Sequence, residues 1–502
     1  MPADTPEVEP AVPRPLSPTD AAATSADSQG RRRWAALSVL LLVQFMIILD
    51  VSVVNIALPT IQADLGFSRA GLTWVVDSYV LVAGSLLLFG GRLGDVLGRR
   101  RTFLVGVAVF GVASVVCGLA QTPGMLVGAR LAQGLGEALA APAALGLIAL
   151  LFTDPRERAK AIGLFGGISG LAGTSGPIVS GALVEYSTWR WIFLINLPVA
   201  LAALLLVPRL VDRGLPSRNV GLDARGALLV TAGLAGVVYG LIEAATHDWT
   251  STRVLLPLLG GVVLLALFAL SQRSARDPLL PLSFLRERTR LVTDGVALLF
   301  STVFFAQFFV TTLYLQDVLD FGALRTGLGF LPFGVAVGIA LSIATKLVPR
   351  VGLRPLLVTG LLLAAAGALA FTRITPDGSY LTQVLPASVL LALGSGLVLP
   401  TLGNGAVHGV TEDDAGLASG LLQSVQQIGG AVGLAVLTTL SLRRAGEQVA
   451  QGVDPAVAIT DGYVLALQVG VVVLLVAAGL AATLRRGAGS AVDPAAAVVP
   501  VA

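Results

Sequence analysis

Four charged side chains lie in stretches of the sequence that are otherwise strongly apolar: Asp50, Asp77, Arg130 and Glu137. A charge inside a membrane costs about 2.5–3.5 kcal/mol even on the most lenient insertion scale, so such residues are functional candidates. Burial disfavours the ionised form of a carboxyl, so a buried acid can bind and release a proton as its exposure changes. We therefore predict that these four residues take part in proton coupling.

Each of the four also has a purely structural interpretation. Asp50 could be a static carboxylate paired with an arginine or a helix terminus, and Asp77 could be solvated near a membrane surface. Arg130 and Glu137 are seven residues apart, two helical turns, so they share one helix face with Gln133 between them. An arginine near a carboxylate favours its ionised form, and separating the two would admit a proton. A static buried ion pair is the alternative.

The elements that hold these residues follow from the composition. The chain has 502 residues, of which 55% are hydrophobic and only 13% are charged, whereas soluble domains carry about 25% charged residues. These charges are too few to coat several soluble domains, which excludes a soluble multidomain enzyme and any disordered or fibrous class. The net charge of +3 does not indicate nucleic-acid binding, because basic residues of membrane proteins gather in cytoplasmic loops.

Runs of about 20 apolar residues recur along the chain, and each is long enough to cross a hydrocarbon core as a helix. When both termini are cytoplasmic, most basic residues lie in tails and inner loops, as the positive-inside rule requires. We therefore predict an all-α, multi-pass protein of the cytoplasmic membrane, and the scarcity of lysine indicates a GC-rich bacterium. The fourteen expected spans are 34–58, 72–90, 102–121, 124–151, 159–184, 191–208, 222–243, 253–271, 291–316, 326–345, 355–372, 382–406, 415–440 and 462–484.

An internal repeat divides the chain. GRLGDVLGRRRTFLVG (91–106) aligns with TKLVPRVGLRPLLVTG (345–360) at a shift of 254 residues, and Pro142 aligns with Pro400 at a shift of 258. Two six-helix halves in parallel repeat are a known transporter architecture. The predicted division is a disordered tail (1–30), an N-terminal six-helix half (31–210), a two-helix insert (211–275), a C-terminal six-helix half (276–486) and a C-terminal tail (487–502).

Two glycine-containing motifs suggest conformational roles. In the loop 91–101, glycines allow a tight turn, and Asp95 could accept hydrogen bonds from an arginine or a helix N-terminus and so form a latch. A plain basic anchor is the alternative. In the span 159–184, a proline removes a backbone hydrogen bond and kinks the helix, either passively or for function. The residues concerned are Gly91, Arg92, Asp95, Gly98, Arg99, Arg100, Gly173, Gly176 and Pro177.

A third set of polar residues lies within or beside the apolar spans, where amides and hydroxyls could contact a substrate. Phe304, Phe305, Phe308 and Phe309 crowd one span, and an aromatic wall with a few amides suits a flat, lipophilic molecule. Packing against lipid is the alternative for each aromatic residue. The predicted substrate-binding residues are Asn55, Gln307, Tyr314, Gln423 and Gln427.

Little in the sequence indicates enzyme chemistry. The chain has one cysteine, Cys117, and two histidines, which excludes an internal disulfide framework and a Cys-rich metal site. No phosphate-binding loop is present. We expect no metal and no cofactor, although a polytopic membrane enzyme or a lipid flippase stays an alternative.

Five motifs together resemble a known family: LDVSVVNIALP (49–59), GRLGDVLGRRR (91–101), ARLAQGLGEALAAPAAL (129–145), GLAGTSGP (170–177) and WRWIFLINLP (189–198). Their combination resembles the major facilitator superfamily, specifically the fourteen-span drug:proton antiporter branch of QacA/EmrB-like multidrug exporters. The resemblance implies that Asp50 is the membrane-embedded acid and Arg130 the arginine tied to proton movement. It also implies a latch at Asp95 and Arg99.

The resemblance further implies an antiporter kink at Gly176-Pro177 and an acid at Asp77, where some multidrug members have one. Glu137 departs from the pattern, because a small residue is commoner there. The implied function is a proton-coupled antiporter that exports lipophilic, cationic drugs or antibiotics by alternating access, acting as a monomer. A dedicated exporter of one endogenous natural product is the alternative.

Overall fold

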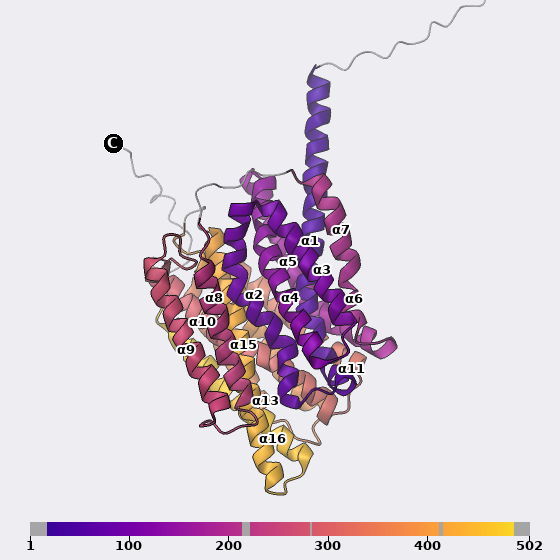
Figure 1. The fold of residues 1–502 in the computed structure, drawn as a ribbon, viewed down its shortest axis with the longest axis vertical. Coiled ribbons are helices and arrows are strands. Elements are labelled where there is room, and N and C mark those ends of the chain that lie inside the picture. The colour runs from indigo at the N-terminus through magenta and orange to yellow at the C-terminus, as the bar shows by residue number, and fades with distance from the viewer. Residues whose placement is uncertain (1–17, 213–220, 282–283, 411–414, 486–502) are drawn as a thin grey trace, which may run out of the picture.

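The computed structural model describes residues 18–212, 221–281, 284–410 and 415–485, and these form a helical bundle without strands (Figure 1). Within the described residues, 14 helical segments are long and apolar enough to cross a membrane. This number confirms the predicted count. Each segment satisfies its backbone hydrogen bonds internally, so its apolar side chains can pack against another helix or against lipid.

The helices fall into three groups along the chain. The first group is α1 (Pro18–Leu65), α2 (Arg69–Leu97), α3 (Arg99–Gly118), α4 (Pro123–Leu151), α5 (Pro155–Tyr186), α6 (Trp191–Leu194) and α7 (Asn196–Leu210). The second is α8 (Ala224–Glu243) and α9 (Thr252–Ser274). The third is η1 (Phe284–Arg286), α10 (Arg288–Leu313), η2 (Tyr314–Val318), α11 (Ala323–Gly329), α12 (Leu331–Val351), α13 (Leu353–Phe371), η3 (Tyr380–Val384), α14 (Leu385–Ala406), α15 (Ala415–Ala450) and α16 (Pro455–Ala482).

Part of the segment that the sequence predicts as a disordered N-terminal tail is helical. Helix α1 begins at Pro18, so residues 18–30 of the expected disordered tail are helical. This stretch is rich in alanine, which has the highest helix propensity, and proline suits the first position of a helix. Residues 1–17 and 486–502 lie outside the described part of the chain, and so does the C-terminal tail predicted at 487–502.

The repeat seen in the sequence recurs in the helix packing. Helix α3 crosses α4 at Gly106 and Gly136, where a Cβ on Gly136 would lie 2.9 Å from the Gly106 carbonyl oxygen. Helix α13 crosses α14 at Gly360 and Gly394, where a Cβ on Gly360 would lie 2.9 Å from the Gly394 carbonyl oxygen. These pairs are related by the same shifts of 254 and 258 residues. Glycine at both crossings lets the backbones approach closely.

Other helix contacts follow the same pattern in both halves. Helix α1 packs on α5 and α7 as α10 packs on α15 and α16, and α2 packs on α4 as α12 packs on α14. The turns between α2 and α3 and between α12 and α13 each contain a glycine with positive φ, 94° at Gly98 and 79° at Gly352. The two halves therefore share one architecture, as the sequence alignment predicts.

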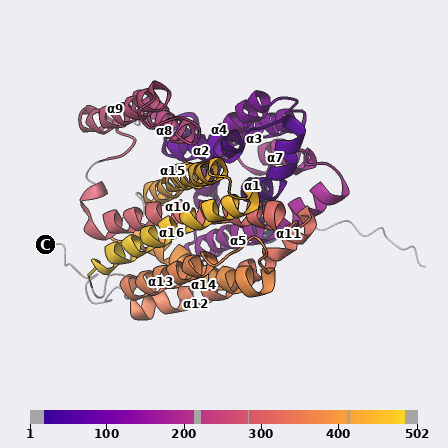
Figure 2. The same cartoon turned by 90° about the horizontal axis from the view of Figure 1, so that it is seen from below.

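The hairpin of α8 and α9 lies at the side of the bundle, where α8 packs against α2 of the first half and α15 of the second (Figure 2). Its hydrogen bonds to the bundle go to α15: the Thr439 hydroxyl donates to the Leu241 carbonyl at 2.7 Å. Arg443 donates to the carbonyls of Ala244 and His247, each at 2.9 Å. The insert thus lies across the junction of the two halves.

The seam between α5 and the helices α11 and α12 is closed along one part and open along the other. On the side away from the chain termini, a Cβ on Gly181 would lie 2.7 Å from the Ala323 carbonyl, and one on Gly327 would meet the Pro177 carbonyl. On the side that carries the termini, Cβ atoms on five α5 glycines would meet nothing within 4 Å. These glycines are Gly163, Gly166, Gly167, Gly170 and Gly173.

Candidate functional site

Asp50 lies at the centre of a buried polar network in the first half, and its side chain is fully buried. Its carboxylate accepts three side-chain hydrogen bonds, from Arg130 Nη1 at 2.5 Å, from Asn196 Nδ2 at 2.7 Å and from Gln133 Nε2 at 3.1 Å. The donors come from α4 and α7, while Asp50 belongs to α1. The carboxylate therefore ties three helices together inside an apolar core.

Arg130 is equally buried, with 1% of its side chain exposed. Besides Asp50, its guanidinium donates to the Val75 carbonyl of α2 at 3.0 Å and to Gln133 Oε1 at 2.9 Å. Its Cζ lies 4.2 Å from the centre of the Tyr79 ring, a distance at which a cation is attracted to an aromatic face. The arginine is thus paired, hydrogen-bonded and covered, which are the conditions under which a buried charge is tolerated.

Local sequence places these groups. Helix α4 begins at Pro123, where the Thr122 hydroxyl caps it by accepting from the Met125 N–H at 3.2 Å, a common start signal. Three turns later Gly134 faces α2, where a Cβ would lie 2.5 Å from the Tyr79 carbonyl. This close approach brings Arg130, one turn away, against Val75 and Tyr79.

Glu137 lies on the same face of α4, and the structure brings it together with Gln427 of α15. Gln427 Nε2 donates to Glu137 Oε1 at 2.9 Å, so a hydrogen bond joins the two halves at this point. Glu137 Oε2 has no hydrogen-bond partner, and neither does the Tyr79 hydroxyl. The sequence predicted functional roles for Glu137 and Gln427 but not the contact between them.

Asp77 of α2 is fully buried, and neither of its carboxyl oxygens has a hydrogen-bond partner. It lies two helical turns from Gly84, where a Cβ would lie 2.7 Å from Gln427 Cβ, so its helix face is the one toward α15. The interpretation of Asp77 as a solvated residue near the membrane surface is therefore wrong, because α2 packs tightly on α15 along this face.

The loop motif forms a latch inside the first half. Arg99 Nη2 lies 3.2 Å from Asp95 Oδ1, and Arg99 Nη1 donates to the Gly146 carbonyl of α4 at 2.9 Å. Arg100 Nη2 donates to the Pro208 carbonyl of α7 at 3.1 Å. Gly91 packs on Pro142, and Gly98 supplies the turn. The latch thus joins α2, α3, α4 and α7, and no described contact of it reaches the second half.

The glycine–proline motif of α5 faces α1 and α11. A Cβ on Gly176 would collide with the Ser52 side chain, so only glycine fits where α5 crosses α1. Pro177 lies where α5 meets α11 at Gly327, and Gly173 marks the point at which the α5–α12 seam opens. The motif therefore lies at the boundary between the closed and the open part of the seam.

The residues predicted to bind a substrate do not form one group. Gln427 contacts Glu137, while Asn55 donates to the Val51 carbonyl of its own helix at 3.4 Å and Gln307 to Thr311 at 3.0 Å. The Tyr314 hydroxyl donates to the Thr375 carbonyl at 2.8 Å, which anchors the connection between α13 and α14. Tyr314 is fully buried, so its position favours a structural role. Gln423 is half-buried on α15.

Sequence reasoning missed three members of the buried network. Asn196 and Ser114 complete the shell around Asp50 and Gln133, and Ser114 Oγ accepts from Gln133 Nε2 at 2.8 Å. Tyr79 covers Arg130. Asn196 is the one polar residue in the apolar run Ile192–Leu197, and that pattern is a signal that could have revealed it. Ser114 and Tyr79 carry no such signal.

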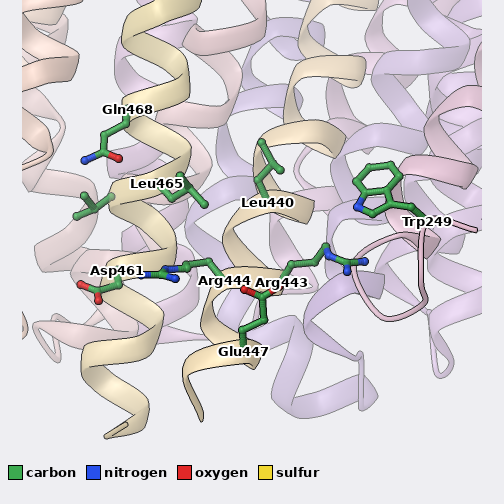
Figure 3. A pocket seen from close by; sticks show the side chains of 9 residues that line it. Trp249, Leu440, Arg443, Arg444, Glu447, Asp461, Leu465 and Gln468 are labelled. Atoms are coloured by element: carbon green, nitrogen blue, oxygen red, sulfur yellow. The ribbon is translucent and has the colours of Figure 1, made fainter. Parts of the chain in front are cut away.

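A cavity of about 430 Å³ opens at the far side of the bundle, away from the termini (Figure 3). It lies between α15, α16 and the connection of α8 to α9, with Arg443 reaching toward Trp249 and Arg444 lying between Glu447 and Asp461. Among the described residues, no cluster of three or more His, Cys, Asp or Glu side chains could hold a metal ion.

The fold and the site define a class: a polytopic helical membrane transporter built from two repeated six-helix halves, with a buried acid–arginine network in one of them. The sequence model of the Major Facilitator Superfamily matches residues 40–434. The chain belongs to this superfamily, which confirms the predicted family, fold and transport role, as opposed to an enzyme.

Two curated relatives and one solved structure illustrate the similarity. The puromycin resistance protein of Streptomyces alboniger is 43% identical over 472 residues, covering 92% of this chain and 93% of that protein. The cephamycin export protein of Amycolatopsis lactamdurans is 39% identical over 404 residues, covering 79% and 82%. An auto-inhibited POT-family peptide transporter, 15% identical, shares the fold with a TM-score of 0.68, covering 90% and 97%.

Proposed function

We propose that this protein is a proton-coupled antiporter that exports lipophilic, antibiotic-like molecules from a bacterial cell by alternating access. The observation that carries the proposal is the buried Asp50–Arg130 pair, which lies in the membrane-spanning region with 0% and 1% of the side chains exposed. Ionisable side chains are costly inside a membrane, and where they are paired and buried in a helical bundle they mark ion or proton pathways.

Two features support alternating access. The α5 seam is closed against α11 on one side of the bundle and open on the other, as expected of a transporter captured in one of two states. The two halves are repeats that meet along α2 and α15 and along α5, α11 and α12, so rocking of one half against the other can reverse which side is open.

The relatives support the direction and the chemical class of the substrate. One is a puromycin resistance protein and the other a cephamycin export protein, so we infer outward transport of a small molecule. Buried acids such as Asp77 and Glu137 suit a lipophilic cation. A specific observation favours a second candidate function: both relatives bear the name of one antibiotic, as expected of exporters dedicated to a single natural product.

The remaining parts of the proposal concern setting and energy source. We place the side that carries the termini in the cytoplasm, because the basic loop with Arg92, Arg99 and Arg100 lies there and basic loops stay cytoplasmic. The lipid bilayer and protons are then the partners, and a single copy is the transport unit. We propose that the proton gradient supplies the energy and that no cofactor is required, because one charge crossing 100 mV is worth about 2.3 kcal/mol.

The experiment is transport into inside-out membrane vesicles with an imposed proton gradient, using puromycin and the cationic dye ethidium as probes. We expect uptake of at least one probe that stops when the gradient is collapsed with a protonophore. Uptake that does not depend on the proton gradient would contradict the proposed antiport. If puromycin is the only member of a panel of unrelated antibiotics that is transported, the dedicated exporter is favoured instead.

A matched pair of variants tests the role of the buried pair. Asp50→Asn removes the charge while keeping the shape, and we expect it to abolish gradient-driven uptake. Ser388→Ala changes the position of α14 that is equivalent to Arg130 in the repeat, and we expect uptake to be unchanged. Normal uptake by Asp50→Asn would remove Asp50 from the mechanism.

A further inference from the structure

Three carboxyls are buried between the membrane-spanning helices of the first half, and their hydrogen-bond partners differ. Asp50 accepts from three side-chain donors, one of them a guanidinium. An ionised carboxylate offers about four lone-pair sites, so most of them are filled. Protonating Asp50 would leave Arg130 buried beside a neutral partner, which is strongly unfavourable. The geometry therefore makes Asp50 the counter-ion of Arg130.

Glu137 has the opposite surroundings. It is 1% exposed, yet it accepts a single hydrogen bond, from Gln427, and its second oxygen has no partner. A buried carboxylate that has only neutral donors is poorly solvated, and its neutral form needs fewer partners. The Tyr79 hydroxyl lies close enough to the same carboxyl to act as a second neutral donor, although no hydrogen bond of regular geometry joins them.

The helices packed against α4 present few ionisable groups to Glu137. Helix α1 brings Asp50, α2 brings Asp77 and Tyr79, and α4 itself brings Arg130; α3 adds only the buried Cys117 thiol beside Gln133. Helix α5 has no ionisable side chain between Lys160 and Glu185, and α15 has none before Arg443. Arg130 is already committed to Asp50, so no cation is left to neutralise Glu137.

Glu137 also differs from Asp50 and Asp77 because its hydrogen bond connects the two halves of the protein. Its partner Gln427 belongs to the second half, whereas all three side-chain donors to Asp50 belong to the first. A hydrogen bond to an ionised acceptor is about twice as strong as one between neutral groups. A change in the charge of Glu137 therefore changes the strength of a contact between the two halves.

We propose that Glu137, and not Asp50, is the carboxyl that takes up and releases the exchanged proton in each transport cycle. Its ionised form strengthens the contact with Gln427 across the halves, and its protonated form weakens that contact. The proton is bound at the free Oε2 and leaves to water without breaking the Gln427 bond. Asp50 remains the counter-ion of Arg130. This inference rests on the proposed proton coupling.

The test measures protons released when a probe binds to purified full-length protein. Puromycin, or ethidium, is added to the protein in a weakly buffered detergent solution that contains a pH-sensitive dye. We expect the wild type to release about one proton per bound probe, because binding and proton loss are linked. Glu137→Gln should bind the probe and release none. Ser395→Ala, at the equivalent position of α14, should behave as the wild type.

The pH dependence of affinity gives a second readout. With one linked proton, the apparent Kd of the wild type should fall by up to about tenfold per unit rise in pH, whereas Glu137→Gln should show a flat profile. Glu137→Asp should restore part of the slope. If Glu137→Gln does not fold, Gln427→Leu keeps the carboxyl and removes its cross-half partner, and it should still release a proton with a shifted profile.

The possible failures are distinguishable. A wild type that binds a probe and releases no proton overturns the proposed antiport and this inference with it. A wild type and a Glu137→Gln variant that both release the proton overturn this inference and leave antiport standing. Loss of proton release in a folded Asp50→Asn variant, together with its retention in Glu137→Gln, would assign the proton to Asp50.

Discussion

The two halves of this transporter share one backbone plan and differ in where charge is allowed. Helices α4 and α14 are repeat equivalents, each with a glycine crossing, at Gly136 and Gly394, and each with an internal proline. At the positions of Arg130, Gln133 and Glu137, however, α14 has Ser388, Leu391 and Ser395. The polar stripe of the first half has no counterpart in the second.

The two halves therefore share a backbone scaffold but not the ionisable groups that lie on it. The Ser395 hydroxyl donates to the Leu391 carbonyl of its own helix at 2.8 Å, so the second half satisfies that group without another helix. Arg130 instead needs partners from α1 and α2. The buried acid described in the second half, Asp294, lies near the termini side, one turn from Arg290. One half thus holds the ionisable network, and the other offers amides and aromatic rings.

The largest difference between the halves is expected from Arg130→Ala and its equivalent Ser388→Ala. Removing Arg130 leaves the Asp50 carboxylate buried without its cation, which costs about 3–5 kcal/mol. Removing the Ser388 hydroxyl should change stability by less than about 0.5 kcal/mol. Thermal unfolding of the purified variants, with probe transport in parallel, measures both. Equal losses in the two variants would mean that the halves do not differ in this way.

The next prediction concerns what the halves have in common. Gly136→Ala and Gly394→Ala each place a Cβ within 3.0 Å of backbone atoms of the crossing helix, and overpacking of this kind costs about 1–3 kcal/mol. The loss of stability should be similar in both halves. Gly128→Ala and Gly403→Ala are the controls, because a Cβ there meets nothing within 4 Å. A cost confined to one half would break the structural equivalence.

The turn glycines sharpen the comparison further. Gly98 and Gly352 have φ of 94° and 79°, a region that costs other residues about 1–2 kcal/mol. Gly98→Ala and Gly352→Ala should therefore destabilise to a similar extent. Only Gly98→Ala should also slow transport, because Arg99 follows it and bonds to Asp95 and Gly146, whereas Leu353 follows Gly352. Equal transport by both variants would deny the latch a functional role.

The smallest effect is expected at the rim of the second half, where Glu287 caps α10. Burial alone would raise the pKa of Glu287, but hydrogen bonds from the backbone of Arg290 and Thr289 outweigh it and lower the pKa. A lowered pKa means that the carboxylate stabilises the fold above its ordinary pKa, and that this contribution is lost as the pH falls. Glu287→Ala should cost about 1 kcal/mol at neutral pH, the usual value of a cap.

The pH profile provides the check on this cap. Thermal stability of the wild type and of Glu287→Gln is compared between neutral pH and pH 4. The glutamine keeps an acceptor for the Arg290 N–H but cannot titrate, so the stability difference between the two proteins should shrink as the pH falls. A difference that is constant across this range would show that the charge of Glu287 contributes nothing.

The sequence alone was enough for the membrane-spanning segments, the repeat and the charged residues of the first half. Hydrophobic runs of the required length, and glycines at matching shifts such as Gly98 and Gly352, are local properties. The same holds for Arg130 and Glu137, whose seven-residue spacing places them on one face whatever surrounds the helix. The predicted disordered tail of residues 1–30 differs from the structure at 18–30, because helix propensity, rather than apolarity, extends α1 to Pro18.

Only the tertiary structure decided which partners these groups have. The sequence could not show that Asn196 and Gln133 donate to Asp50, that Gln427 donates to Glu137, or that Asp77 is buried against α15. Hydrogen bonds between residues 55 to 290 positions apart depend on how the helices cross. Helix crossings are set by the summed packing of many side chains, which spacing along one helix does not encode.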